Sequence, residues 1–437
     1  MGADKESGFI MNISRNEIMP GVFLNCLKSE KFKTSFMSVN LLNQLTRETA
    51  SINALIPFVL KRGTVSCPDM ESLGARLDEL YGAVIEPVVR LTGEIQGIGL
   101  IASFPEEKYL PKGSSVTSDV INLLAEMLLM PNMKGGLFRP DYVESEKENL
   151  ADLIRSAVNE KRSYAVQRCV EEMCCYEDIA AGKFGKAEDV EGINYIKLTK
   201  QYHDVLKTSP VEIFYFGQES EQKIKACVED AFCTMPRGDI DYDIGTDIRM
   251  NSVEDEPRYF EENMDVTQGK LVLGFRLGEC MEDPDIPSIR VFNAVYGSGV
   301  NSKLFTNVRE KLQLCYYASS RMDINKGILL AMSGIDFDRY EDAKDEILRQ
   351  LDNIRCGDIS DEEMQYAKAG IMSDMKALTD SQYGLESFFY SNLMAGYEWT
   401  PEELCELISE VTKEDVINVA SGVVLDLVYF LRDKKDD

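Results

Sequence analysis

The apolar and polar positions of this chain predict strands and helices that do not alternate regularly. Residues 93–109 (GEIQGIGLIASFPEEKY) form an apolar run typical of a buried strand, and residues 120–129 carry the apolar spacing of a helix that faces a core. Residues 139–165 continue with a charged periodic pattern that predicts one long helix. Strands and helices mixed in this way favour an α+β fold over a parallel βαβ arrangement.

The pattern of the first half recurs in the second half. Residues 198–217 contain a helix start, a short amphipathic helix and a β-rich run, and residues 411–432 repeat that order. Strand-like runs also open both halves, at residues 32–42 and 269–278. We therefore expect two homologous lobes, each a mainly antiparallel sheet packed with helices.

A segment rich in Asp, Gly and Pro separates the two halves. It predicts a first lobe over residues 1–232, a linker over residues 233–258 and a second lobe over residues 259–437. The linker stretch DIDYDIGTD resembles a calcium-binding loop, but Gly245 falls one place late and Met250 occupies the position of the closing Glu. We therefore do not expect bound calcium.

Composition and charge narrow the class of protein. The 437 residues include 47 Lys and Arg against 75 Asp and Glu, a formal charge of −28 that repels nucleic acid and anionic lipid and would attract a basic peptide. No apolar run is long enough to span a bilayer, and the first residues, MGADKESGFI, lack the pattern of a secretory signal. The eleven cysteines have neither CxxC nor ligand-like spacing, which fits reduced thiols. The sequence predicts a cytoplasmic protein.

Two stretches carry recognisable motifs. Residues 55–83 (LIPFVLKRGTVSCPDMESLGARLDELYGA) contain an apolar helix, an exit turn with a basic residue, Gly and Thr, and a second helix. Residues 295–320 (VYGSGVNSKLFTNVREKLQLCYYASS) contain a Gly-rich turn followed by a basic helix and a strand. With the order of the predicted elements, these stretches resemble the insulinase, pitrilysin and mitochondrial processing peptidase family of zinc peptidases over essentially the whole chain. The resemblance implies a processing-peptidase-like metallohydrolase fold.

The zinc motif of that family is His-x-x-Glu-His, with a further Glu on a later helix. Histidines four residues apart lie on one helix face and can bind one Zn²⁺, while the Glu between them deprotonates the bound water. By resemblance, these places fall here on Ala54, Pro57 and Phe58, and the distal Glu falls on Leu153. None of these side chains can bind a metal or transfer a proton, so the resemblance implies that zinc is bound only by a partner chain.

The histidine count leads to the same expectation without any alignment. The only histidine of the chain is His203, so a site with two histidines cannot be built, and no cysteine or carboxylate cluster has ligand spacing. We predict no metal or other cofactor in this chain and a surface or helix-packing role for His203. Pro57 would also remove a backbone hydrogen bond and kink its helix, which suits a catalytic helix poorly.

The second stretch keeps more of the family pattern. The resemblance implies that Arg309 and Tyr316 face the peptidase chamber and hold the substrate backbone near the zinc of another lobe, a role that suits guanidinium and phenol donors. Alternatively, Arg309 pairs with a neighbouring carboxylate and Tyr316 packs in the sheet. Gln313 replaces a family Gly, which predicts a different local turn. The GSG at residues 297–299 lacks the Lys and Ser or Thr of a P-loop and predicts a tight turn between helices.

These features predict a non-catalytic subunit of a heterodimeric processing-type zinc peptidase. Such a subunit would join a zinc-bearing homologue, contribute Arg309 and Tyr316 to substrate binding, and form part of the chamber wall. The alternative is a structural or binding scaffold of the same fold with no role in proteolysis. An enzyme that uses unrelated residues is disfavoured because the sequence offers no convincing nucleophile and base.

Overall fold

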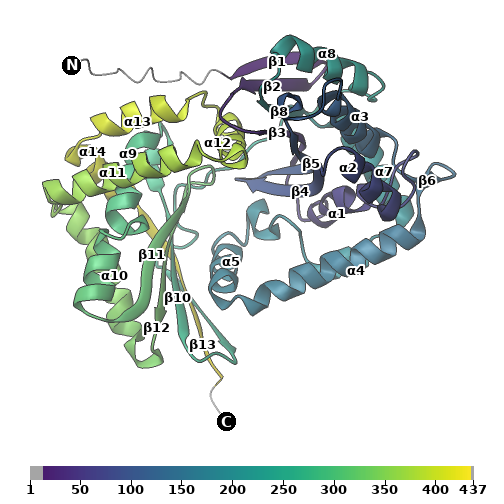
Figure 1. The fold of residues 1–437 in the computed structure, drawn as a ribbon. Coiled ribbons are helices and arrows are strands. Elements are labelled where there is room, and N and C mark those ends of the chain that lie inside the picture. The colour runs from purple at the N-terminus through teal and green to yellow at the C-terminus, as the bar shows by residue number, and fades with distance from the viewer. Residues whose placement is uncertain (1–12, 435–437) are drawn as a thin grey trace, which may run out of the picture.

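The structure, a computed structural model, describes residues 13–434 and contains two large sheets, each covered by helices (Figure 1). The N-terminal stretch MGADKESGFI, for which a signal peptide was not expected, lies outside the described residues. No helix of the described part is long and apolar enough to cross a membrane.

The first sheet has six strands in the order β1-β2-β8-β3-β5-β4. Its strands are β1 (Ser14–Met19), β2 (Val22–Lys28), β3 (Thr34–Gln44), β4 (Val84–Thr92), β5 (Ile95–Pro105) and β8 (Val211–Gly217). β2 and β8 run parallel, and the other neighbours run antiparallel. A two-stranded ribbon, β6 (Met133–Lys134) and β7 (Leu137–Phe138), lies outside this sheet.

The second sheet has five strands in the order β11-β12-β10-β13-β9. Its strands are β9 (Arg258–Met264), β10 (Gly269–Arg276), β11 (Cys315–Asp323), β12 (Ile328–Ile335) and β13 (Val424–Asp433). Only β13 and β9 run parallel. This order matches β4-β5-β3-β8-β2 of the first sheet, including the place of the parallel pair. The shared topology confirms the predicted α+β fold with two homologous, mainly antiparallel lobes.

Within residues 13–434, eight α-helices precede the second sheet in the chain, and six follow its first two strands. The first group is α1 (Ala50–Leu60), α2 (Met70–Glu79), α3 (Val116–Leu129), α4 (Pro140–Ser156), α5 (Lys161–Met173), α6 (Ala187–Glu191), α7 (Tyr195–Thr208) and α8 (Glu221–Phe232). The second group is α9 (Ile286–Asn293), α10 (Tyr340–Arg355), α11 (Asp361–Leu378), α12 (Gln382–Met394), α13 (Pro401–Glu410) and α14 (Lys413–Gly422). Two π-helical segments, η5 (Ala294–Ser298) and η6 (Leu304–Lys311), lie between α9 and β11. No helix or strand occurs within residues 233–257.

The single long helix predicted over residues 139–165 is wrong. α4 ends at Ser156, a short 3-10 turn covers Ala157–Asn159, and α5 begins at Lys161. The Glu160 side chain accepts a hydrogen bond from the Arg162 backbone N–H and so caps a new helix. The charged periodicity continues across the break, so the pattern alone did not reveal the change of direction.

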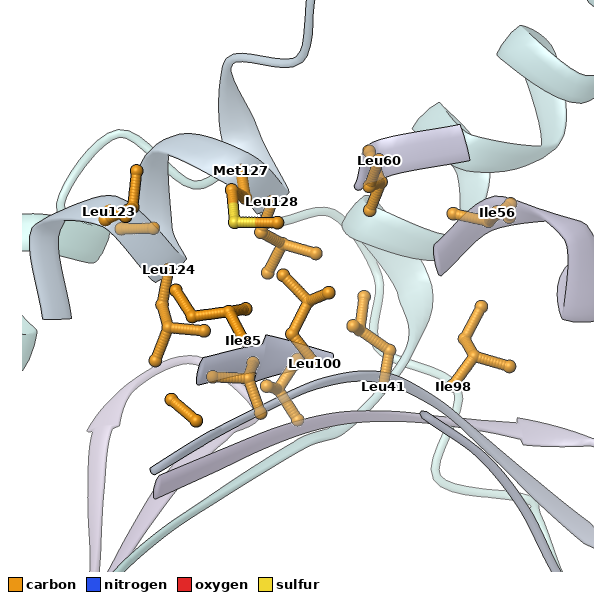
Figure 2. Close-up of a cluster of buried hydrophobic side chains, with 14 of the residues drawn as sticks. Leu41, Ile56, Leu60, Ile85, Ile98, Leu100, Leu123, Leu124, Met127 and Leu128 are labelled. Carbon is orange, nitrogen blue, oxygen red and sulfur yellow. The ribbon is translucent and has the colours of Figure 1, made fainter. Parts of the chain in front are cut away.

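The core of the first lobe lies between its sheet and helices α1, α3, α7 and α8. Figure 2 shows side chains of α1 and α3 pointing toward the sheet, where apolar residues of β3, β4 and β5 meet them. The strand β8 is buried on both faces: Val211, Ile213 and Tyr215 join this core, while Phe214 and Phe216 face the other way. The second face of the sheet therefore needs a cover of its own.

Each sheet is covered partly by a helix from the other half of the chain. α12 of the second half packs its aromatic residues on the first sheet, with the Phe389 ring centroid 6.2 Å from that of Phe216. α5 of the first half packs Ala165, Cys169 and Met173 on β10 and β13 (Figure 1). Gly274 of β10 permits this approach, because a Cβ there would lie 2.6 Å from the Met173 sulfur. The two halves thus exchange helices and cannot separate without exposing both sheets.

A buried ionic network also joins the halves. Glu177 accepts hydrogen bonds from Arg276 of β10 at 2.7 and 3.0 Å and pairs with Lys326 at 2.7 Å. Lys326 donates to Glu94 of the β4–β5 turn at 2.8 Å, and Arg276 donates to Asp426 of β13 at 2.8 Å. Burial opposes ionisation of Glu177, but the hydrogen bonds from the two cations outweigh it and lower the pKa of this carboxyl. The network holds the turn of the first sheet against the second sheet.

Candidate functional site

The α1 positions that the resemblance predicts to match zinc ligands hold packed apolar side chains. Ala54 and Pro57 are buried in the core of the first lobe, and Phe58 packs partly buried against it. The helix continues across Pro57 to Leu60, so the proline does not end it. Apolar contacts therefore surround these three positions.

Leu153 lies near the end of α4, which packs against α1. Its side chain is 45% exposed, whereas Glu146, two turns earlier, is buried and forms an ion pair with Arg62. Within residues 13–434 no group of three or more His, Cys, Asp or Glu side chains is arranged to hold a metal. His203 lies exposed on α7, beside the ring of Tyr202.

Arg309 and Tyr316 lie on either side of an exposed turn in the second lobe. Arg309 is on η6 and Tyr316 is the second residue of β11. The Arg309 side chain is 41% exposed, lies over the Phe305 ring and comes within 3.6 Å of the neighbouring Glu310. Tyr316 is 64% exposed, and its hydroxyl donates a hydrogen bond of 3.3 Å to Asp336. Arg309 keeps N–H donors available to a ligand, whereas the single O–H donor of Tyr316 would have to leave Asp336 to bind one.

Gln313 occupies the turn between these two residues and has a φ of +50°. This left-handed conformation favours glycine, because a Cβ there meets the following carbonyl oxygen. Gln313 therefore adopts a backbone conformation that usually favours glycine.

The GSG stretch was predicted to form a tight turn between helices, but Gly297 and Ser298 are the last two residues of η5, and only Gly299 lies in the connection to η6. Gly297 also packs directly against β11: a Cβ there would lie 2.6 Å from the Ser320 hydroxyl and 2.7 Å from Leu304. Its role is close packing, which explains a glycine without any phosphate ligand.

A cleft of about 920 Å³ opens between the lobes. Its walls come from the end of β4, the end of α4 with Leu153, the end of β11 and one face of α12. Four basic side chains line it, namely Arg90, Lys183, Arg290 and Arg321. One acidic side chain, Asp323, joins them. Sequence reasoning missed this cleft, because its basic residues are far apart in the chain and share no motif.

Burial alters the titration of several of these groups. It lowers the pKa of Lys183 and of Arg290, since a cation loses hydration there. Burial also raises the pKa of Asp323, although the backbone N–H of Lys326 donates to its carboxylate at 3.2 Å and acts in the opposite direction. The charged forms in this cleft are therefore incompletely stabilised by the chain itself.

Comparison with known proteins bears directly on the predicted family. The chain is 33% identical over 414 residues to the probable inactive metalloprotease YmfF of Bacillus subtilis, which covers 94% of this chain and 96% of that protein. The family model described as the peptidase M16 inactive domain matches residues 192–371. The chain belongs to the peptidase M16 family. The family resemblance predicted from the two motifs is thereby confirmed.

Solved structures share the fold of this chain over nearly its whole length. A conserved protein from Enterococcus faecalis has a TM-score of 0.87 at 26% identity, covering 98% of this chain and all of that one. A chain of complex III2 from Candida albicans has a TM-score of 0.73 at 15% identity, covering 96% of this chain and 95% of that one. The M16 fold thus extends over nearly the whole chain. Both the name of the family model and the name of the Bacillus subtilis relative describe inactive proteins, which is consistent with a non-catalytic role for this homologue.

Proposed function

We propose that this M16 homologue is a non-catalytic subunit that pairs with a zinc-bearing homologue and contributes Arg309 and Tyr316 to substrate binding. The proposal rests on a contrast between the predicted metal-site positions and the pair Arg309 and Tyr316. The four positions of the lost metal site hold no donor groups, while Arg309 and Tyr316 remain exposed and only weakly engaged by their own chain. The pattern fits a division of labour in which the partner holds the metal.

The contacts of Arg309 support a binding role over a structural one. A guanidinium offers five N–H donors. Among residues 13–434, the ion pair of Arg309 is with the adjacent Glu310 at 3.6 Å, which is long and solvent-exposed and contributes little stability. A peptide carbonyl, or the oxyanion that forms from it, could take the remaining donors.

The surroundings of the pair support contact with another molecule. Val300 and Leu312 are exposed on the segment that carries Arg309, and Tyr316 follows them. Val300 precedes η6 and Leu312 follows it, so both offer exposed apolar surface at the ends of the element that carries Arg309. Within the proposed pair, this segment would face the peptide substrate, and the charge of −28 would favour a basic peptide in the initial approach.

The first experiment compares the chain alone with the chain co-expressed with a zinc-bearing M16 homologue. We expect no peptide cleavage by the lone chain and chelator-sensitive cleavage by the pair, because only the partner would supply the metal. Cleavage by the lone chain at a rate that chelators do not change would contradict the proposal.

A second experiment separates substrate binding from a scaffold role within the same pair. Arg309→Ala and Tyr316→Phe are each expected to lower kcat/KM by roughly 10²-fold, as for removal of one transition-state donor. Matched controls are Arg339→Ala, whose side chain is also 41% exposed and lies 3.7 Å from Asp342, and Tyr259→Phe, which is 62% exposed on β9. If the pair still assembles and all four variants cleave at the parental rate, the chain is a scaffold.

A further inference from the structure

The cleft between the lobes has a charge opposite to that of the protein. The chain as a whole carries 28 more acidic than basic residues, yet four basic side chains and one acidic side chain line this cleft. By contrast, a smaller pocket beside α14 is lined by four acidic residues and no basic one. The positive lining is therefore local and does not follow from composition.

The chain neutralises this lining only in part, through the Arg90–Glu386 pair and Asp323. Among the described residues, Lys183, Arg290 and Arg321 have no carboxylate oxygen within 4.0 Å of their side-chain nitrogens. Arg90 pairs with Glu386 of α12 at 2.7 Å through Nη1, but its Nε and Nη2 atoms are buried and lack hydrogen-bond partners. Like charges that converge without partners repel one another, and buried unpaired donors are costly.

Two further donors at the cleft are also unsatisfied. The Nε of Arg290 is buried without a partner. The hydroxyl of Tyr390, a residue only 2% exposed that lines the cleft from α12, has no hydrogen-bond partner either. These four atoms, including the two of Arg90, have almost no accessible surface, and the Tyr390 hydroxyl faces Gly97 of β5, so a ligand in the cleft would not reach them in this structure. The exposed cations of the cleft, Lys183 and Arg321, are the groups that a ligand can reach directly.

The backbone around the cleft suits an extended peptide. β4 and β11 are the edge strands of the two sheets, and the cleft is lined by the ends of both, at Val89–Thr92 and Arg321–Asp323. An edge strand presents backbone N–H and C=O groups without a strand partner, to which a peptide can add as a further strand. The volume of about 920 Å³ is large for a single small anion and suits several residues.

We infer that the cleft binds the carboxylate groups of an acidic peptide segment, held between β4 and β11 by Arg290, Arg321 and Lys183. Guanidinium groups bind carboxylates through paired N–H···O bonds, which are stronger than neutral hydrogen bonds. The overall negative charge would slow the approach of such a segment, so it would belong to a peptide or protein that also carries basic residues. The inference rests on the proposed function only in taking a peptide as the ligand.

Binding to the purified chain alone tests this inference, so the result does not depend on a zinc-bearing partner. Fluorescence anisotropy would compare a labelled glutamate-rich peptide with its glutamine counterpart. We expect the glutamate peptide to bind with one-to-one stoichiometry and at least about tenfold more tightly. Equal affinities, or no binding of either peptide, would overturn the inference.

Variants locate the site. Arg290→Gln and Arg321→Gln should each weaken glutamate-peptide binding by about tenfold or more, whereas Arg349→Gln, an exposed arginine on α10 away from the cleft, should change it less than about twofold. Arg321 is exposed, so its variant should fold even if the one at partly buried Arg290 does not. Equal effects of Arg321→Gln and Arg349→Gln would overturn the location.

Competition with small anions tests whether the cleft prefers the carboxylates of a peptide or a free small oxyanion. Citrate and inorganic phosphate would be added as competitors of the labelled peptide. If either displaces the peptide at a concentration near the dissociation constant of the peptide itself, the site is one for a small oxyanion and the peptide assignment is wrong. Displacement only at concentrations at least about tenfold higher supports a peptide ligand.

Discussion

The α1 segment that corresponds to the zinc site and the segment with Arg309 and Tyr316 have opposite environments. On α1, Ala54 and Pro57 are buried and contact core residues. On the second segment, Arg309 and Tyr316 are exposed, and their contacts with their own chain are long. The first segment has become part of the core, while the second keeps polar groups whose contacts contribute little stability. The comparison teaches that the α1 segment is held by core packing, whereas the Arg309 and Tyr316 segment is the one that a ligand could contact under the proposed function.

The largest expected effect on the free energy of unfolding concerns the buried ionic network that joins the lobes, where polar groups stabilise the fold. Glu177→Gln should lower the free energy of unfolding by about 3–5 kcal/mol, because it leaves the buried cations Arg276 and Lys326 without their shared carboxylate. Chemical denaturation would measure this change. The surface variant Glu261→Gln, whose ion pair with Arg432 is exposed, should change it by less than about 0.5 kcal/mol.

The same network predicts a dependence on pH. Because the pKa of Glu177 is lower in the folded chain than in the unfolded chain, its contribution is present above the unfolded pKa and is lost as pH falls through the folded pKa. The difference in stability between the parent and Glu177→Gln should therefore shrink in acid. A difference that stays constant down to the lowest pH at which the parent folds would show that Glu177 is not ionised in the network.

A smaller effect tests the α1 segment. Ala54→His should destabilise the chain by about 2–3 kcal/mol, because a larger polar ring would enter a fully packed site without a partner. Leu153→Glu, at the exposed position of the distal ligand, should cost less than about 0.5 kcal/mol. Thermal and denaturant unfolding would compare the two variants. A neutral Ala54→His would mean that space for a metal ligand persists.

The smallest expected effect on the free energy of unfolding concerns Gln313, in the turn between Arg309 and Tyr316. Gln313→Gly should stabilise the chain by about 0.5–1 kcal/mol, because glycine adopts the observed φ of +50° without strain. Gln365→Gly, on the exposed face of α11, should instead destabilise by about 1 kcal/mol. Urea midpoints of the two variants would show opposite signs. Loss of stability in Gln313→Gly would indicate that the Gln side chain itself supports the turn.

Several elements could be predicted from local pattern. The repeated helix and strand order at residues 198–217 and 411–432 becomes α7 with β8 and α14 with β13, which take equivalent places in the two sheets. Periodicity records which faces are buried, and that information is local. The break between α4 and α5 was missed because its signal, a Glu160 cap, is indistinguishable from the charged surface around it.

The sequence alone determined that this chain has no His-x-x-Glu-His site, since the side chains at positions 54, 57, 58 and 153 have no ligand atoms and only one histidine exists. It also determined the family, because two motifs persist within short windows. Only the tertiary structure decided that α5 and α12 cover the opposite sheets and that Arg90, Lys183, Arg290 and Arg321 meet in one cleft. Those contacts join residues far apart in the chain, and the pairing of distant faces is set by packing of the complete chain, which no local window of sequence contains.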